Sequence, residues 1–149
     1  MNNIKILSSL IKKYLKNNIK NVIPILKEYN GDDWKKYKLN TDKFSYNRNI
    51  IYQDTDFEII LITWGENSES QIHDHSKNGC AFKVLEGELT EQLYNTDLQN
   101  KKTTVYSVED INYIDNSLGY HKILNNSILS NSIHIYSPPN YKCKNIFIK

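Results

Sequence analysis

The sequence predicts a mainly β fold, a sandwich or barrel of short strands with two to three α-helices packed on its outside. Residues 4–29 carry apolar side chains at helical spacing, whereas from residue 46 onward short β-rich runs alternate with turn residues. No Pro/Gly/Ser-rich linker divides the 149 residues. We therefore expect one domain over 1–149, with a helical N-terminal cover in 1–40 and a β-barrel in 44–149.

The N-terminal region is expected to form two amphipathic helices and a short third one. The two apolar stripes comprise Ile4, Leu7, Leu10, Ile11, Tyr14 and Leu15, then Ile19, Val22, Ile23, Leu26 and Tyr29. Pro24 either begins the second helix or kinks it. Asn30 and Gly31 predict a helix end, and Asp32 or Asp33 predicts the cap of a third helix. Stripes of this kind are typical of helices that face a core.

Nine runs are predicted as strands: 46–54, 57–64, 80–86, 88–94, 103–108, 111–114, 121–124, 130–136 and 145–148. In 57–64 both alternating faces are largely apolar, so this strand must be covered on both sides. The N-terminal helices are the expected outer cover.

Composition argues against several classes of partner. The net charge is +2, and the basic residues are scattered rather than gathered into a stripe, so we expect no nucleic-acid partner. The apolar runs are far shorter than the roughly 20 residues that span a bilayer, and early lysines interrupt any signal-peptide core, so we expect no membrane association. Cys80 and Cys143 are too few for a disulfide framework, which favours a reducing, cytoplasmic location.

Two of the four histidines stand in the short stretch QIHDHSKNGC, residues 71–80. In a strand, residues i and i+2 point to one face about 7 Å apart, so His73 and His75 project together while Asp74 faces away. This pair alone is a weak signal, and two ordinary core or surface histidines are the alternative. His121, on a later predicted strand, strengthens the metal interpretation. Three histidines can occupy one face of an octahedral ion and leave three positions open, although they also suit zinc, nickel or copper.

Two segments resemble the paired motifs of the cupin superfamily: WGENSESQIHDHSKNGCAFKVLEG at 64–87 and GYHKILN at 119–125. Cys80 stands where cupins usually carry a glutamate ligand. Further blocks resemble the cysteine dioxygenase type I family of thiol dioxygenases, namely YNRN at 46–49, DNSLGYH at 115–121 and SIHIYSPP at 132–139. The resemblance implies a jelly-roll-like cupin β-barrel and an enzyme that converts L-cysteine and O2 into cysteine sulfinic acid.

The resemblance also implies a metal site and a substrate site. His73, His75 and His121 would bind one iron(II), and Tyr46 and Trp64 would line the pocket. Three neutral imidazoles leave the ion at +2, which favours a thiolate substrate as the missing anion. Arg48, the only arginine, is the candidate for the substrate carboxylate because its planar fork grips a carboxylate as lysine cannot.

Ser132, His134 and Tyr136 alternate with isoleucines, so they share one face of a strand. Three buried polar groups would form a hydrogen-bonded relay, whereas the alternative is an ordinary half-exposed strand. The resemblance implies that Tyr136 points at the oxygen and substrate site, that Ser132 and His134 orient it, and that His134 is not a metal ligand. It further implies a thioether between Cys80 and Tyr136, a plausible cis bond before Pro138, and a place for Cys143 near the pocket rim.

Two alternatives to a cysteine dioxygenase remain. One is a dioxygenase of another small thiol such as 3-mercaptopropionate, although such relatives typically lack an arginine at the position of Arg48. The other is a metal-binding cupin without turnover. Only ten residues follow Pro139, fewer than the family usually carries, which puts substrate enclosure in doubt. Relatives act as monomers, and we expect a monomer here.

Overall fold

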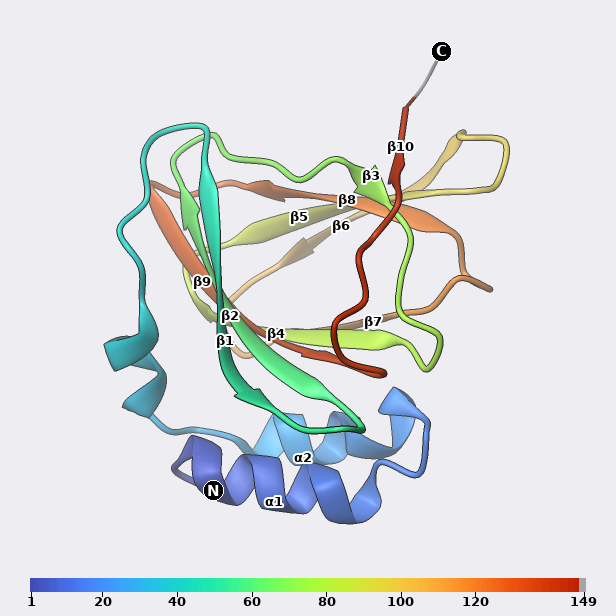
Figure 1. Ribbon diagram of the computed structural model, residues 1–149. Helices are drawn as coiled ribbons and strands as arrows, with labels where there is room; N and C mark the ends of the chain where they lie inside the picture. Colours follow the sequence, from blue (N-terminus) through green and yellow to red (C-terminus); the bar gives the residue numbers. More distant parts are fainter. Residues whose placement is uncertain (148–149) are drawn as a thin grey trace.

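The computed structural model describes residues 1–147, so the predicted strand 145–148 ends outside the described residues (Figure 1). The helical elements are α1 (Ile4–Tyr14), η1 (Ile19–Val22), α2 (Ile23–Glu28) and η2 (Asp33–Tyr37). The strands are β1 (Tyr46–Gln53), β2 (Glu58–Gly65), β3 (Ile72–His73), β4 (Cys80–Glu86), β5 (Leu89–Tyr94), β6 (Asn100–Tyr106), β7 (Ile111–Ile114), β8 (Tyr120–Asn125), β9 (Leu129–Tyr136) and β10 (Asn145–Ile146). No helix in this described part is long and apolar enough to cross a membrane.

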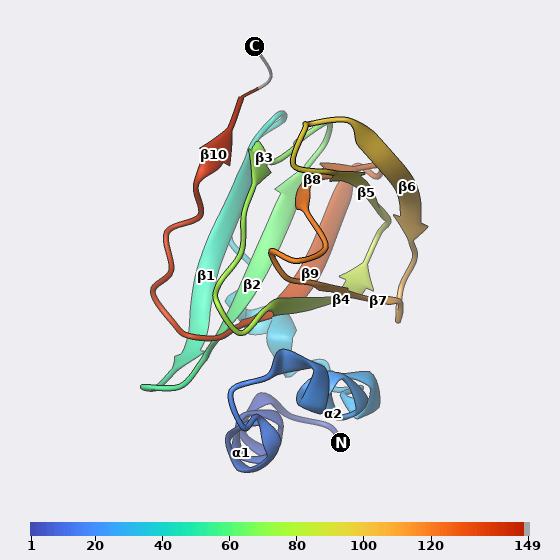
Figure 2. The same cartoon turned by 90° about the vertical axis from the view of Figure 1, so that its right-hand side faces the viewer.

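The strands form two five-stranded antiparallel sheets, as predicted for a mainly β fold (Figure 2). The first has the order β1-β2-β9-β4-β7 and the second the order β10-β3-β8-β5-β6. The predicted barrel is wrong in one respect, because no hydrogen-bonded ladder among the described strands joins one sheet to the other. Apolar side chains join them instead: Phe82 and Ile114 of the first sheet share a cluster with Leu89 and Ile123 of the second.

Strand β2 is buried along its whole length, which confirms that it is covered on both sides. Ile59 and Leu61 pack in a cluster with residues of the N-terminal helices, whereas Ile60 and Ile62 point into the cluster between the sheets. The buried apolar side chains of β9 alternate between the same two clusters. These two central strands therefore carry the helical layer on one face and the interior between the sheets on the other (Figures 1 and 2).

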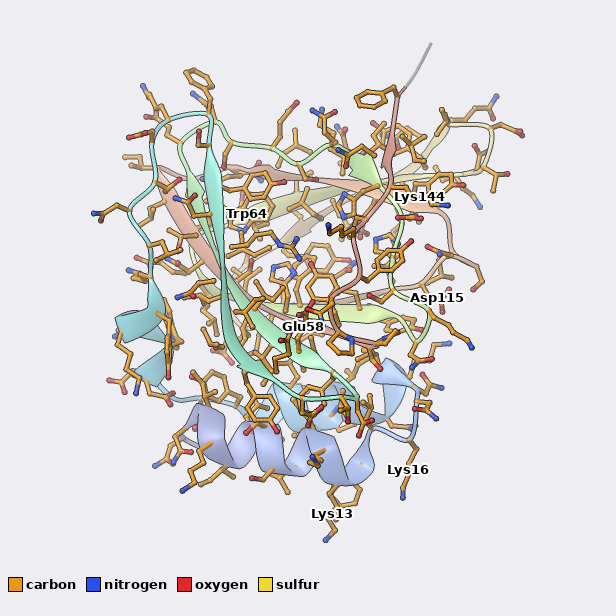
Figure 3. The ribbon with its side chains drawn as sticks, viewed as in Figure 1. Lys13, Lys16, Glu58, Trp64, Asp115 and Lys144 are labelled. Atoms are coloured by element: carbon orange, nitrogen blue, oxygen red, sulfur yellow. The ribbon has the colours of Figure 1, made fainter. Side chains whose placement is uncertain are left out.

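The N-terminal helices begin and end where local chemistry allows. The Asn3 side chain caps α1 by accepting a hydrogen bond from the Ile6 N–H at 2.9 Å. Pro24 lies in the first turn of α2, where its missing N–H costs nothing, so it begins that helix rather than kinking it. The predicted helix type is wrong for the first part of the second helix and for the whole third helix, because residues 19–22 and 33–37 form 3₁₀ helices. Lys13 and Lys16 point away from the helical layer (Figure 3).

A fully buried lysine connects the helical layer to the first sheet. Lys83 lies on β4, and its Nζ donates to the backbone oxygens of Leu26 at 3.4 Å, Lys27 at 3.0 Å and Tyr29 at 2.6 Å. The Glu109 carboxylate lies 2.9 Å from the same Nζ. The Leu26 oxygen also accepts from the Tyr29 N–H, so the ammonium is needed chiefly by the oxygens of Lys27 and Tyr29 at the end of α2.

Candidate metal centre

Strands β3 and β8 bring two histidines from distant parts of the chain face to face. His73 is paired with His121 in the ladder, and their ring centroids lie 4.6 Å apart. The His75 ring lies 4.4 Å from that of His121 and 5.3 Å from that of His73. One nitrogen from each of the three rings lies within 4.8 Å of the others, so together the three can hold a metal ion.

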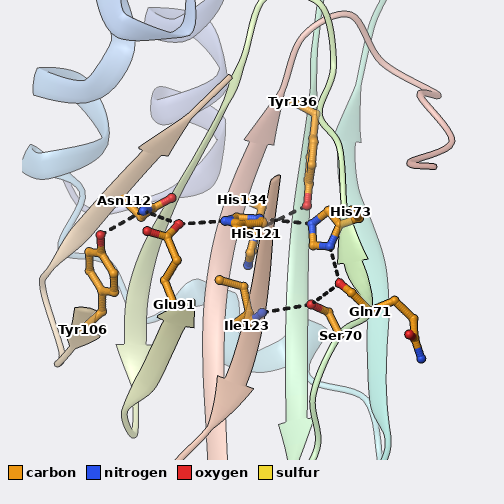
Figure 4. A network of polar contacts seen from close by, with 10 residues as sticks. All are labelled: Ser70, Gln71, His73, Glu91, Tyr106, Asn112, His121, Ile123, His134 and Tyr136. Atoms are coloured by element: carbon orange, nitrogen blue, oxygen red, sulfur yellow. Dashed lines mark hydrogen bonds and ion pairs between the residues drawn. The ribbon is translucent and has the colours of Figure 1, made fainter. Parts of the chain in front are cut away.

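Hydrogen bonds select which nitrogen of each ring faces the cluster. His73 Nδ1 lies 2.7 Å from the Gln71 backbone oxygen, and His121 Nδ1 lies 2.7 Å from Glu91 Oε2 (Figure 4). The Gln71 backbone oxygen can only accept, and so can the Glu91 carboxylate in its ionised form. With these partners each Nδ1 carries the proton and each Nε2 keeps its lone pair. The two Nε2 atoms then face each other at 3.1 Å, an arrangement that a bound cation stabilises.

His75 supplies the third nitrogen from a buried position. Both of its ring nitrogens lack a hydrogen-bond partner among the described residues, although the residue is only 1% exposed. A buried, unpartnered imidazole is costly unless a ligand satisfies it, so the site fits a metal ion. Burial, followed by the neighbouring His121 and His73, lowers the pKa of His75 and keeps its ring neutral.

The prediction that His73 and His75 share one strand is only partly right. Strand β3 ends at His73, and His75 is held by the side chain of Asn116 instead of by a neighbouring strand. The His75 N–H donates to Asn116 Oδ1 at 2.8 Å, and Asn116 Nδ2 donates to the His75 backbone oxygen at 3.1 Å. One amide side chain thus replaces a ladder partner and brings the ring to the cluster.

A cavity of about 290 Å³ lies beside the three histidines. Its lining includes two of the histidines, His73 and His121, and six further predicted site residues, Tyr46, Arg48, Trp64, Cys80, His134 and Tyr136. Cys143 also contributes to its wall, whereas His75 and Ser132 do not line it. The rings of Tyr46 and Trp64 are 4.7 Å apart. The Arg48 guanidinium lies over the Tyr136 ring, 5.4 Å from its centroid, and leaves its charge available to the cavity.

A chain of hydrogen bonds runs behind this cavity from Trp64 to Tyr136. Trp64 Nε1 donates to Ser132 Oγ at 2.9 Å, and Ser132 Oγ lies 2.6 Å from His134 Nε2. An indole N–H can only donate, so the Ser132 oxygen accepts from Trp64. Among the described residues the Ser132 hydroxyl has His134 Nε2 as its one remaining partner, which assigns its proton to that nitrogen. His134 Nδ1 therefore carries a proton and points it at the Tyr136 oxygen, 3.5 Å away. All four side chains are buried, so the half-exposed alternative is wrong.

Cys80 lies directly opposite Tyr136 in the ladder between β4 and β9. Opposed residues in an antiparallel pair have Cβ atoms about 5 Å apart, within reach of a covalent link between a thiol and a phenol ring. Burial raises the pKa of both groups, which keeps the thiol and the phenol protonated. Their neutral state is consistent with the burial of both groups.

Comparison with known proteins identifies the family of this chain. The family model "Cysteine dioxygenase type I" matches residues 1–147. The chain belongs to the cysteine dioxygenase type I family. Cysteine dioxygenase type 1 of Danio rerio is 31% identical over 139 residues, an alignment covering 85% of this chain and 69% of that protein. The Homo sapiens protein of the same name is 32% identical over 137 residues, covering 85% of this chain and 68% of its own.

Solved structures support the cupin fold of this cysteine dioxygenase family member. A Klebsiella pneumoniae protein with a double-stranded β-helix domain has a TM-score of 0.63 at 15% identity, covering 76% of this chain and 94% of its own. A cupin superfamily protein from Desulfitobacterium hafniense has a TM-score of 0.56 at 11% identity, covering 66% and 83%. At such low sequence identity, these similarities show only that the fold is shared.

In this cysteine dioxygenase family member, a carboxylate that sequence reasoning missed contacts the cluster. Glu91 lies on β5 and is buried, and burial raises its pKa to about 7. The available signal was the alternation along β5, since Leu89, Glu91 and Leu93 fall on one strand face and a carboxylate in an apolar row needs an explanation. Asn112 and Tyr106 complete its surroundings (Figure 4).

The segment after the cis Ser137-Pro138 bond forms part of the cavity wall. Asp74 holds it: one carboxylate oxygen accepts from the Tyr141 hydroxyl at 2.7 Å and the other from the Lys144 N–H at 2.6 Å. Strand β10 continues this attachment by pairing with β3. The residue between two of the clustered histidines therefore also fixes a wall of the pocket, and the expected cis bond is confirmed.

Proposed function

We propose that this chain is an iron(II)-dependent cysteine dioxygenase that converts L-cysteine and O2 into cysteine sulfinic acid. Both oxygen atoms go to sulfur, so that R–SH plus O2 gives R–SO2H. The observation that carries the proposal is the convergence of three neutral imidazoles beside a cavity that also holds an arginine and a buried tyrosine. Membership of the cysteine dioxygenase type I family supports it.

His73, His75 and His121 would hold the iron. When bound, iron(II) supplies the redox chemistry that carries electrons from sulfur to dioxygen. No carboxylate belongs to the three-residue ligand cluster, so the site retains positive charge and favours the anionic form of a thiol. The histidines also fix the place at which that thiol must meet oxygen.

Arg48 would bind the carboxylate of cysteine. Its guanidinium stands at the cavity over the Tyr136 ring and can offer two parallel N–H groups to a carboxylate. Such a contact would orient the amino acid so that its sulfur faces the histidines. This same contact is the one that would distinguish cysteine from thiols with a differently placed carboxylate.

Tyr136 would act on the reacting atoms through its hydroxyl. Because the relay through Trp64, Ser132 and His134 gives the phenol oxygen a donor, the hydroxyl proton remains free to point into the cavity. There it would donate a hydrogen bond to the substrate or to oxygen. Ser132 and His134 would hold the ring in that orientation without touching the substrate.

Cys80 and Tyr136 would also form a thioether. The sulfur–carbon bond replaces the S–H bond and one ring C–H bond, so two protons and two electrons leave, and dioxygen is the oxidant that accepts them. The link would lock the phenol beside the cavity. An intact mass lower by two hydrogens after aerobic treatment with iron(II) and cysteine is the expected result, and a Cys80→Ser variant should show no such change.

Oxygen consumption by the iron-loaded protein with L-cysteine, with the product analysed as sulfinate, tests the proposed function. We expect one O2 consumed for each sulfinate formed. 3-Mercaptopropionate serves as the second substrate, and activity confined to it would replace cysteine in the proposal. No sulfinate from either thiol, in a protein shown to contain iron, would refute a dioxygenase function.

A further inference from the structure

We infer that Glu91 is a positioning residue of the metal centre. It holds His121 in the tautomer that can bind a metal ion, and it supplies a negative charge on the side of the His121 ring that faces away from the ion. The inference rests on the metal site of the proposed function. It concerns a residue that belongs to neither the three histidines nor the cavity lining.

The geometry around Glu91 is directed at a single histidine. Its Oε2 lies 2.7 Å from His121 Nδ1, and the same oxygen accepts from Asn112 Nδ2 at 2.8 Å. Asn112 Nδ2 also donates to the Tyr106 hydroxyl oxygen at 2.9 Å. Figure 4 shows the resulting row from Tyr106 through Asn112 and Glu91 to His121 and on to His73. The carboxylate is thus held from behind and aimed at the imidazole.

The three histidines are unequal in this respect. Within residues 1–147, His73 Nδ1 donates to a backbone oxygen and the His75 ring has no partner, whereas His121 faces a carboxylate. A carboxylate that accepts from the remote nitrogen makes the ligating nitrogen more basic. His121 should therefore be the strongest donor of the three, and the site should carry about one positive charge less than three neutral imidazoles would leave.

Burial of this carboxylate needs a compensating charge. Glu91 is 6% exposed, and an ionised carboxylate in such surroundings is costly without a cation or several donors. Asn112 and His121 contribute two hydrogen bonds but no positive charge when the ring is neutral. An ion at the far nitrogen of His121 would provide that charge. The metal and Glu91 then stabilise each other through one imidazole ring.

Metal affinity of the isolated variants tests this inference without relying on turnover. The apo-protein is titrated anaerobically with Fe(II), and separately with Co(II) followed by its absorbance, for the wild type and for Glu91→Gln, which keeps the size but removes the charge. Glu86→Gln is the matched control, because Glu86 is a partly buried carboxylate that contacts Asn131 and Lys38 and none of the histidines.

We expect Glu91→Gln to weaken binding of both metals about 10- to 100-fold, and to shift the Co(II) spectrum, while Glu86→Gln binds as the wild type does. Asn112→Ala, which releases the carboxylate, should weaken binding several-fold and provides the test if Glu91→Gln does not fold. Affinities within twofold of the wild type in the folded variants would overturn the inference. A wild type that binds neither metal would instead refute the metal site on which the proposed function depends.

Discussion

Replacing Ser132 by alanine removes the hydroxyl group that links Trp64 to His134 in the chain of hydrogen bonds. The Trp64 Nε1–H loses its acceptor at 2.9 Å and His134 Nε2 loses its donor at 2.6 Å. Both side chains are buried, so the loss of either bond leaves a buried polar group without its protein partner. Each buried group left unsatisfied costs about 1–3 kcal/mol, so the variant should lose about 2–6 kcal/mol of unfolding free energy.

Urea denaturation measures this loss, and Ser8→Ala is its control. Ser8 is also buried, but its hydroxyl donates to the Lys5 backbone oxygen within α1, so its removal should change stability by only about 0.5 kcal/mol. Without Ser132 the tautomer of His134 is no longer set, and we expect kcat for cysteine oxidation to fall about 100-fold with little change in KM. A stability loss below about 1 kcal/mol would refute the assigned bonds. A large loss of stability with unchanged kcat would show that these hydrogen bonds stabilise the fold and do not contribute to catalysis.

Three further predictions concern the cavity and the turn that follows β1. Arg48→Lys keeps the charge but loses the fork, so KM for cysteine should rise about tenfold or more, while steady-state oxidation of 2-aminoethanethiol, which lacks a carboxylate, stays the same. Asp74→Ala should make the segment 141–145 sensitive to limited proteolysis and raise KM, whereas unchanged cleavage would mean that other contacts hold this wall. Burial alone would raise the pKa of Asp54, but N–H groups of the following turn outweigh it, and the pKa lies below 3.8 in the folded protein. Its contribution to stability is therefore present above about pH 4 and lost as the pH falls through the folded value, so Asp54→Asn should destabilise by about 1 kcal/mol at pH 7 and by less at pH 3. A loss that does not depend on pH would contradict this.

Much of the fold was predictable because periodicity reports burial. The unbroken apolar run of β2 predicted cover on both faces, and the polar alternation of β9 predicted that Ser132, His134 and Tyr136 share a face. Whether the two sheets close into a barrel depends on edge pairing, which a pattern of alternating residues does not encode.

The site was predictable where residue type alone restricts the chemistry. The histidines, the single arginine and the cysteine at the position of a usual ligand can be read directly from the sequence. Contacts between distant polar residues are not, because Asn116 near His75, and Glu91 near His121, depend on how loops and sheets meet. Asparagine and glutamate are common on protein surfaces, so their presence in a sequence does not indicate a functional site until their burial is known.

Lys83 has a consequence for the order in which the protein folds. Helix α2 contains six residues, too few to persist alone in water, and two backbone oxygens at its end, those of Lys27 and Tyr29, accept from an ammonium that follows 54 to 56 positions later in the chain. A nascent chain that has only its first forty residues outside the ribosome therefore lacks the group that completes its own helices. The N-terminal layer and strand β4 must become native together, and a 1–40 peptide should be largely unfolded by circular dichroism.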